Sequence, residues 1–61
     1  MFVVITRDSN NVVWYFKSAY LHYNWTTDVK KAKKFKTERE ACAMVRKLWL
    51  NDGGLYQAVY V

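Results

Sequence analysis

The stretch Asn24–Ala41, NWTTDVKKAKKFKTEREA, determines much of the expected fold of this chain. Asp28, or a threonine just before it, is suited to cap a short helical turn over Val29–Ala32, because its side chain accepts from the first free backbone N–H groups. Thr37 and Glu40 have the spacing of a capping box, in which the hydroxyl accepts from the N–H of the glutamate and the carboxylate reaches back. We therefore expect a long helix to begin directly after Thr37.

The predicted helix runs from about Glu38 to Leu50 and has one apolar side. Its apolar residues fall on one continuous arc at helical spacing: Ala41, Cys42, Met44, Val45, Leu48 and Trp49. Its basic residues, Arg39, Arg46 and Lys47, fall on the opposite side. Glycine follows at residues 53 and 54, where a left-handed residue commonly ends a helix. The apolar arc is expected to pack on a sheet.

Two segments near the start of the chain predict a hairpin. Residues 2–7 (FVVITR) carry apolar side chains on both faces, which is typical of a strand in the middle of a sheet. Residues 8–11 (DSNN) favour a tight turn, because Asp, Ser and Asn bond locally to the backbone. Residues 12–17 (VVWYFK) are predicted to return as the second strand, and residues 55–61 (LYQAVYV) form the last one.

In the middle of the chain the sequence does not decide where the third strand lies. Residues 18–23 (SAYLHY) either extend the second strand past a bend or form a third short strand. Residues 33–36 are predicted to be a short edge strand, whose lysines would resist pairing with other chains. The prediction is an α+β domain over residues 1–61: a small antiparallel sheet of three or four strands with one helix packed on one face, in the order strand, strand, (strand), helix, strand.

One helix covers only one face of such a sheet, so large side chains on the other face need a second explanation. Either the loop over residues 23–34 folds back across them, or the face is open to a partner protein or to a second copy of the chain. In the second case Tyr15, Tyr56 and Tyr60 are the candidate contact residues, since tyrosine often anchors interfaces.

The composition indicates a folded basic domain. Hydrophobic residues make up 52% of the chain and aromatic residues 18%, and large rings offset the limited burial available to 61 residues. The net charge of +5 favours polyanions such as nucleic acid or nucleotides, and it also suits plain solubility. A single cysteine and the early change to Arg7-Asp8 predict a cytoplasmic protein without a signal peptide or a membrane span.

Catalysis and metal binding are the function classes that the sequence supports least. A nucleophile and base would have to be Cys42 and His22, but Cys42 is expected to be buried on the apolar arc and His22 to be a half-buried ring. The acidic residues have turn and cap positions, and one cysteine with one histidine gives no zinc-ligand spacing. We therefore predict a protein that is not an enzyme and that needs no metal or cofactor.

The lysine-rich segment provides the clearest functional signal. Five lysines occur within residues 30–36, and no acid lies between Asp28 and Glu38. Lysines attract phosphates without reading bases, and neighbouring rings offer stacking surfaces to single-stranded nucleic acid. The candidate polyanion-binding residues are Lys30, Lys31, Lys33, Lys34, Lys36, Arg39, Arg46, Tyr23 and Trp25. In the alternative interpretation, the lysines only solubilise an edge and Trp25 fills the core.

The pattern W-x-x-D-x-x-x-A-x-x-F-x-T-x-x-E-A at residues 25–41, followed by a helix and a closing aromatic strand, resembles a group of very short phage and prophage proteins. Most of these proteins have no assigned function. The resemblance covers most of the chain and implies an accessory phage protein that acts on its host by binding. It implies no catalytic residues.

Two functions are therefore expected. The leading prediction is binding of nucleic acid or a nucleotide through the lysine-rich segment. The alternative is an anti-defence protein that inhibits a host defence or transcription enzyme through the aromatic sheet face. Polyanion binding should weaken steeply with salt, whereas protein inhibition should tolerate lysine changes and fail when the sheet tyrosines are truncated.

Overall fold

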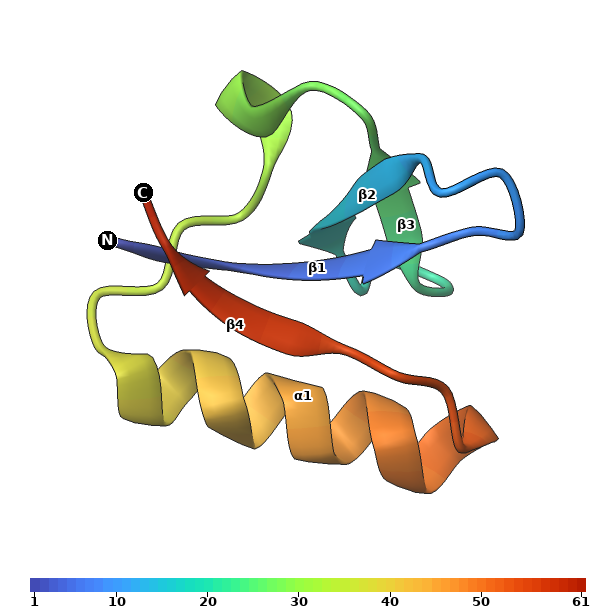
Figure 1. Cartoon of the computed structure of the whole chain (residues 1–61). Coiled ribbons are helices and arrows are strands. Elements are labelled where there is room, and N and C mark those ends of the chain that lie inside the picture. The colour runs from blue at the N-terminus through green and yellow to red at the C-terminus, as the bar shows by residue number, and fades with distance from the viewer.

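The computed structural model describes all 61 residues and has the predicted α+β fold. Four antiparallel strands form one sheet in the order β3-β2-β1-β4, and one helix lies across one face of it (Figure 1). The elements are β1 (Phe2–Arg7), β2 (Val13–Ser18), β3 (Asn24–Thr26), the 3-10 turn η1 (Val29–Lys31), α1 (Glu38–Asp52) and β4 (Gln57–Tyr60). None of the helices is long and apolar enough to cross a membrane.

β1 lies in the middle of the sheet, as its two apolar faces predicted, with β2 on one side and β4 on the other. Ile5 pairs with Tyr15 of β2, and Val4 pairs with Ala58 of β4. Side chains alternate between the faces of a strand, so Val4 faces α1 and Val3 faces away from it. Both valines are fully buried, which shows that each face of the sheet is covered at this point.

β2 bends away from β1 in its second half, and the segment after η1 fills the gap. The N–H of Lys33 donates to the Phe16 carbonyl at 2.9 Å, and Phe35 exchanges two backbone hydrogen bonds of 2.8 Å with Phe2. The chain thereby passes from the η1 side of the sheet to the α1 side (Figure 1). The prediction that residues 33–36 form an edge strand is wrong, because this segment is held between β1 and β2.

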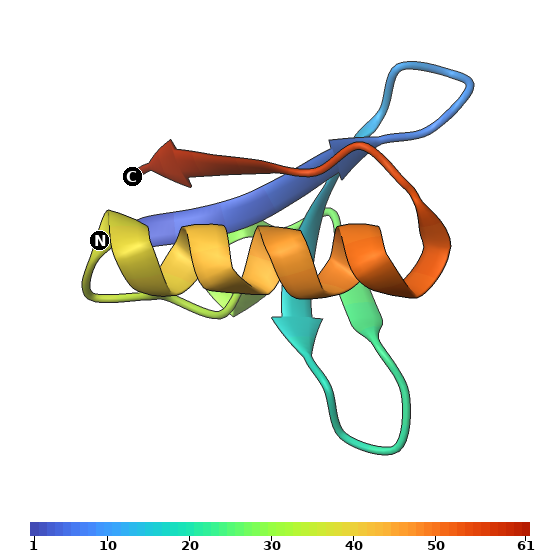
Figure 2. The same ribbon diagram turned by 90° about the horizontal axis from the view of Figure 1, so that it is seen from below.

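The third strand is Asn24–Thr26, later in the chain than the candidate segment Ser18–Tyr23. Phe16 pairs with Trp25, and the register then shifts before Ser18, where β2 has an irregularity. The residues between Ser18 and Asn24 form the turn that joins the two strands. This hairpin projects past α1 in the view of Figure 2.

α1 begins and ends with caps of the predicted kind. Thr37 Oγ1 accepts from the N–H of Glu40 at 3.2 Å, while the Glu40 carboxylate accepts from the Thr37 hydroxyl at 3.2 Å rather than from a backbone N–H. Gly53 has a φ of +71° and donates its N–H to the Trp49 carbonyl at 2.7 Å, which closes the last turn. The helix ends at Asp52, slightly later than predicted.

Only the middle of the predicted apolar arc is buried. Ala41 and Leu48 are fully covered by the sheet. Cys42 and Trp49, at one margin of the arc, are exposed, and Trp49 keeps 54% of its surface in solvent. The expected burial of Cys42 is therefore wrong, because the sheet covers a narrower stripe of the helix than the arc of apolar residues.

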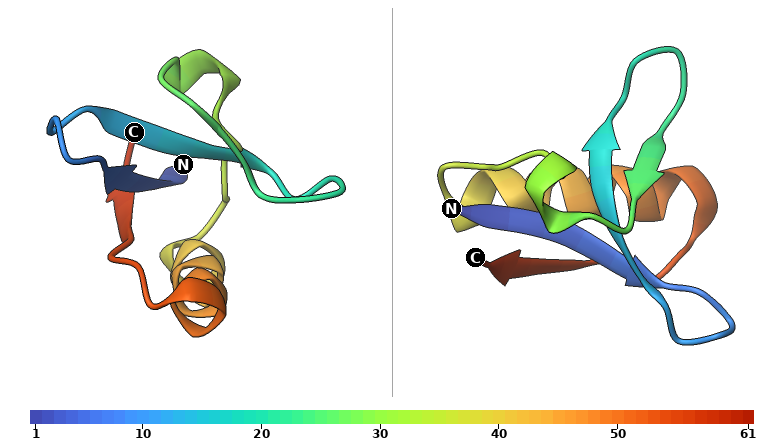
Figure 3. Two further views of the ribbon diagram at one scale, coloured as in Figure 1. Left: turned by 90° about the vertical axis from the view of Figure 1, so that its right-hand side faces the viewer. Right: turned by 90° about the horizontal axis from the view of Figure 1, so that it is seen from above.

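The main core lies between the sheet and α1. Its buried members are Val4, Phe16, Phe35, Ala41 and Leu48. The other face has a smaller cover, because η1 lies on the side of the sheet opposite to α1 (Figure 3), and Ala32 directly after η1 is buried. The loop that follows β3 therefore covers part of this face, in agreement with the first of the two sequence interpretations.

The three sheet tyrosines do not share one face. Tyr56 and Tyr60 are each two residues from Ala58, so they point to the same face of the sheet as Ala58, which is the α1 side. Tyr15 pairs with Ile5 and points to the opposite face. Tyr56 is half-buried, and only Tyr60 is largely exposed, at 72%. The single aromatic surface expected from these residues is therefore not formed.

Candidate functional site

Two adjoining hollows lie between the β2–β3 hairpin and α1. The first, of about 310 Å³, is lined by Phe16, Lys17, Ser18, Ala19, Lys33 and Met44. The second, of about 490 Å³, is lined by Ala19, Leu21, His22, Tyr23, Met44, Lys47 and Asn51. Since Ala19 and Met44 line both, the two hollows are neighbours, and we call them together the basic groove.

Asn24 fixes the hairpin that forms one wall of the basic groove. Its side-chain nitrogen Nδ2 lies 2.9 Å from Ser18 Oγ, 3.1 Å from the Tyr20 carbonyl and 3.0 Å from the His22 carbonyl. Leu21, between these two carbonyls, has a φ of +67°, a conformation that a leucine adopts rarely. The Asn24 amide therefore holds a tight turn that places Ala19 and Tyr23 along the groove.

Three lysines from three different elements surround the basic groove. Lys17 belongs to β2, Lys47 belongs to α1, and Lys33 begins the segment between η1 and α1 that lies between β1 and β2. The bond from the Lys33 N–H to the Phe16 carbonyl fixes Lys33 beside β2, and its Nζ lies 5.6 Å from the Phe35 ring centroid. All three side chains are exposed, so their charges face solvent along the groove.

Rings lie on the hairpin wall of the groove. Tyr23 is half-buried and meets Phe16 edge to face, with 6.2 Å between the ring centroids. Tyr20 lines neither hollow, but it follows the groove residue Ala19 in the same hairpin turn and is 77% exposed. Trp25, in contrast, packs in the core, because it stacks on Tyr56 at 5.5 Å and meets Phe16 edge to face at 5.7 Å.

The five lysines of residues 30–36 do not act as one surface. Lys33 lines the groove, whereas Lys34 donates from Nζ to the carbonyls of Val29 and Ala32 at 2.7 and 3.0 Å and so stabilises η1. The remaining three are exposed at other places, on η1 and just before α1: Lys30, Lys31 and Lys36. Lys33 is thus the only member of the cluster that lines the groove.

The helical arginines lie apart from the groove. Arg39 and Arg46 are exposed and line none of the hollows, because they lie on the outer side of α1, while Met44 and Lys47 face the hairpin. They contribute positive potential to the surface but are not groove residues.

The two residues considered for nucleophilic catalysis are far from forming a pair. His22 lines the groove and is exposed, not half-buried as expected, because it lies in the projecting hairpin turn. Cys42 is exposed on α1 and lines none of the hollows. No group of three or more His, Cys, Asp and Glu side chains comes together anywhere in the structure.

Asp52 and Tyr56 form a hydrogen-bonded pair where α1 turns into β4. The Tyr56 hydroxyl donates to Asp52 Oδ2 at 2.7 Å, and the Gly54 N–H donates to Oδ1 at 2.8 Å. These bonds lower the pKa of Asp52 below 3.8, and the bond from Tyr56 has the largest effect. Burial and the neighbouring Asp52 carboxylate raise the pKa of Tyr56 to about 12. The pair fixes the start of β4.

Asp8 has a similar role in the β1–β2 turn. Its carboxylate accepts from Trp14 Nε1 at 3.0 Å and from the N–H groups of Asn10 and Val12 at 2.8 and 3.0 Å. These bonds, of which the one from Trp14 has the largest effect, lower its pKa below 3.8. Both shifted carboxylates are therefore explained by turns and lie outside the groove.

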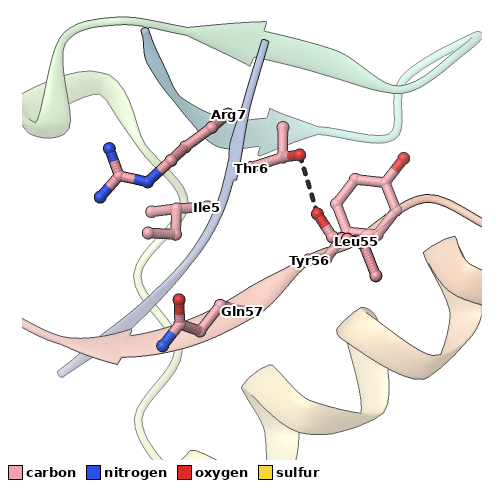
Figure 4. A pocket seen from close by; sticks show the side chains of 6 residues that line it. All are labelled: Ile5, Thr6, Arg7, Leu55, Tyr56 and Gln57. Atoms are coloured by element: carbon pink, nitrogen blue, oxygen red, sulfur yellow. Dashed lines mark hydrogen bonds between the residues drawn. The ribbon is translucent and has the colours of Figure 1, made fainter. Parts of the chain in front are cut away.

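A separate hollow of about 360 Å³ lies where β1 ends and β4 begins (Figure 4). It is lined by Ile5, Thr6, Arg7, Leu55, Tyr56 and Gln57. The Thr6 hydroxyl already donates to the Leu55 carbonyl at 2.9 Å, drawn as a dashed line, and Arg7 points away from the Tyr56 ring. This hollow brings together no set of polar groups that would hold a charged ligand.

Sequence reasoning identified Lys33 and Tyr23 but missed Lys17, Lys47, Tyr20 and Asn24. The missed lysines are isolated in the sequence and meet Lys33 only through the fold, and Asn24 acts through bonds to its own hairpin. The one local signal was Asn24 itself, because asparagine side chains often bond to neighbouring backbone groups in turns. Comparison of the chain with protein-family models, with curated proteins and with solved structures gave no match.

Proposed function

We propose that this protein binds single-stranded nucleic acid in the basic groove. The observation that carries the proposal is the arrangement of Lys17, Lys33 and Lys47 around a half-apolar depression with a tyrosine wall. Lysines from three different elements suit a row of backbone phosphates better than a single anion, because each lysine acts as an independent point charge. This proposal keeps the accessory binding role that the resemblance to short phage proteins implies.

The groove supplies both parts of single-strand recognition. Its lysines attract the phosphate backbone, and each phosphate that they neutralise releases counterions. Tyr23 lines the groove, and the exposed Tyr20 lies in the same hairpin turn, so an unpaired base bound in the groove would have rings nearby to stack upon. Lysine lacks the planar fork that reads base edges, so we expect little sequence preference.

The alternative function, inhibition of a host protein, requires an aromatic sheet face on which Tyr15, Tyr56 and Tyr60 lie together. Tyr15 lies on the opposite side of the sheet from Tyr56 and Tyr60, and Tyr56 bonds to Asp52 within the same chain. The basic groove, in contrast, is assembled from three elements and is open to solvent. We therefore propose nucleic-acid binding as the function.

The proposal is tested by titrating a fluorescein-labelled oligothymidine of about 12 nucleotides and following its anisotropy at 50 and 200 mM salt. If three phosphates are neutralised, the logarithm of the binding constant should fall with the logarithm of salt concentration with a slope of about −2. The variant Lys17→Gln/Lys33→Gln/Lys47→Gln is expected to lose both the binding and the salt dependence. Tyr20→Ala is expected to weaken binding roughly tenfold through lost stacking.

The matched control is Lys30→Gln/Lys31→Gln/Lys36→Gln, which removes the same three charges from exposed positions outside the groove. This control should keep most of the affinity. Equal losses in the two triple variants would show that only net charge matters, and a larger loss in the control would move the site to η1. Absence of binding at 50 mM salt would exclude nucleic acid as the ligand.

A further inference from the structure

The open edge of β4 is unprotected. β4 is an end strand of the sheet, and the N–H of Val61 donates to the Met1 carbonyl at 2.9 Å. Because backbone groups alternate in an antiparallel pair, Ala58 and Tyr60 present their N–H and C=O groups away from β1. Residues 53–61 contain no charged side chain and no proline, the features that usually prevent such an edge from pairing.

The flank of α1 beside this edge is apolar and exposed. Val45 is half-buried under the sheet, and Cys42 and Trp49 lie next to it at helical spacing. Trp49 is 54% exposed, and Tyr60 on β4 is 72% exposed. The exposed apolar flank and the open edge therefore adjoin each other, on the side of α1 opposite to the flank that carries Lys47.

We propose that β4 pairs with β4 of a second copy of this chain, antiparallel and about a two-fold axis near Ala58. A second copy is the occupant because an antiparallel edge is complementary to itself about a two-fold axis, and such an interface would set any charge on the edge against the same charge of the partner copy. Residues 53–61 carry no charge, so no like charges meet there. With Ala58 opposite Ala58, Tyr60 faces Tyr56 of the partner copy, and every outward N–H and C=O of the strand finds a partner.

The helices would meet in the same arrangement. α1 packs chiefly against β1 and β4, and strands in a sheet are about 4.8 Å apart, so a two-fold axis beside β4 places the two copies of α1 about 10 Å apart. That spacing is normal for packed helices. Val45, halfway along α1, would then lie near the axis, with Trp49 of each copy directed toward the flank of the other helix.

The pairing is tested by amide hydrogen exchange and by sedimentation of the intact chain over a range of concentrations. The amides of Ala58 and Tyr60 are expected to exchange rapidly in dilute protein and to become protected as a dimer forms, whereas Val59 and Val61 are protected throughout. Because the added interface is small, we expect a dissociation constant in the micromolar range.

The matched variants are Trp49→Ala and Leu50→Ala, which truncate neighbouring exposed residues on different sides of α1. Trp49→Ala should raise the dissociation constant tenfold or more, while Leu50→Ala should leave it unchanged. A chain that stays monomeric up to millimolar concentration would overturn the proposal. A dimer that leaves the amides of Ala58 and Tyr60 unprotected, or that responds equally to both variants, would overturn it as well. Oligonucleotide binding is measured separately, so its outcome does not decide this test.

Discussion

Replacement of Phe35 by alanine is expected to remove a third or more of the stability of this domain. Phe35 is 7% exposed, stacks on Phe16 with 6.4 Å between ring centroids and holds the chain where it passes between β1 and β2. Truncating a buried phenylalanine to alanine costs about 3–5 kcal/mol. A chain of 61 residues has a total stability of about 3–9 kcal/mol at the usual value per residue, so the loss is a large share of it.

The loss is measured by urea unfolding, followed through tryptophan fluorescence and far-ultraviolet circular dichroism. Phe35→Leu keeps most of the buried volume and should remain folded with a smaller loss, so the series stays measurable even if Phe35→Ala does not fold. Tyr20→Ala is the control, since a 77% exposed ring should change the stability by no more than about 0.5 kcal/mol. A loss below about 1 kcal/mol for Phe35→Ala would refute the account of the segment that passes through the sheet.

Three further perturbations test local features. Asn24→Ala should remove the bonds to the hairpin, accelerate amide exchange over residues 18–23 and weaken oligonucleotide binding, and unchanged exchange would contradict the role of Asn24. Thr37→Ala should destabilise α1 by about 1 kcal/mol in urea unfolding, because it removes the acceptor for the Glu40 N–H; no change would mean that the cap contributes nothing. The pKa of Tyr56 is raised from 10.0 to about 12, so the contribution of the protonated Tyr56 hydroxyl to stability is intact below pH 10 and is lost as pH rises toward 12. The tyrosine absorbance change at 295 nm of the wild type minus that of Tyr56→Phe should therefore show a midpoint near pH 12. A midpoint near pH 10 would contradict the burial of this ring.

Features set by neighbouring residues were predictable from the sequence. Thr37 at the start of α1, Gly53 at its end and Asp28 before η1 all act on backbone groups within a few residues, and all three cap as expected. The central position of β1 followed from its two apolar faces. These features depend on local hydrogen bonding and side-chain alternation, which the order of residues specifies directly.

Features set by contacts between distant segments were not predictable in the same way. Phe35 lies beside Phe2 because β2 bends away from β1, and nothing in the sequence of β2 indicates this bend. The lysines of residues 30–36 also favoured an exposed edge over a position inside the sheet. The helical periodicity gave the apolar arc but not the width of the stripe that the sheet covers, so Trp49 was expected to be buried. Likewise, Lys17 and Lys47 approach Lys33 only after the hairpin and α1 are in place.

The central claim is that the groove between the β2–β3 hairpin and α1 holds a polyanion, and amide chemical-shift mapping tests it most directly. A 15N-labelled sample would be titrated with oligothymidine at low salt. The account predicts that the largest shifts fall on residues 17–23, on Lys33 and on the Met44–Asn51 portion of α1, with small changes on η1. Shifts that are confined to η1, or spread evenly over all exposed lysines, would contradict the claim.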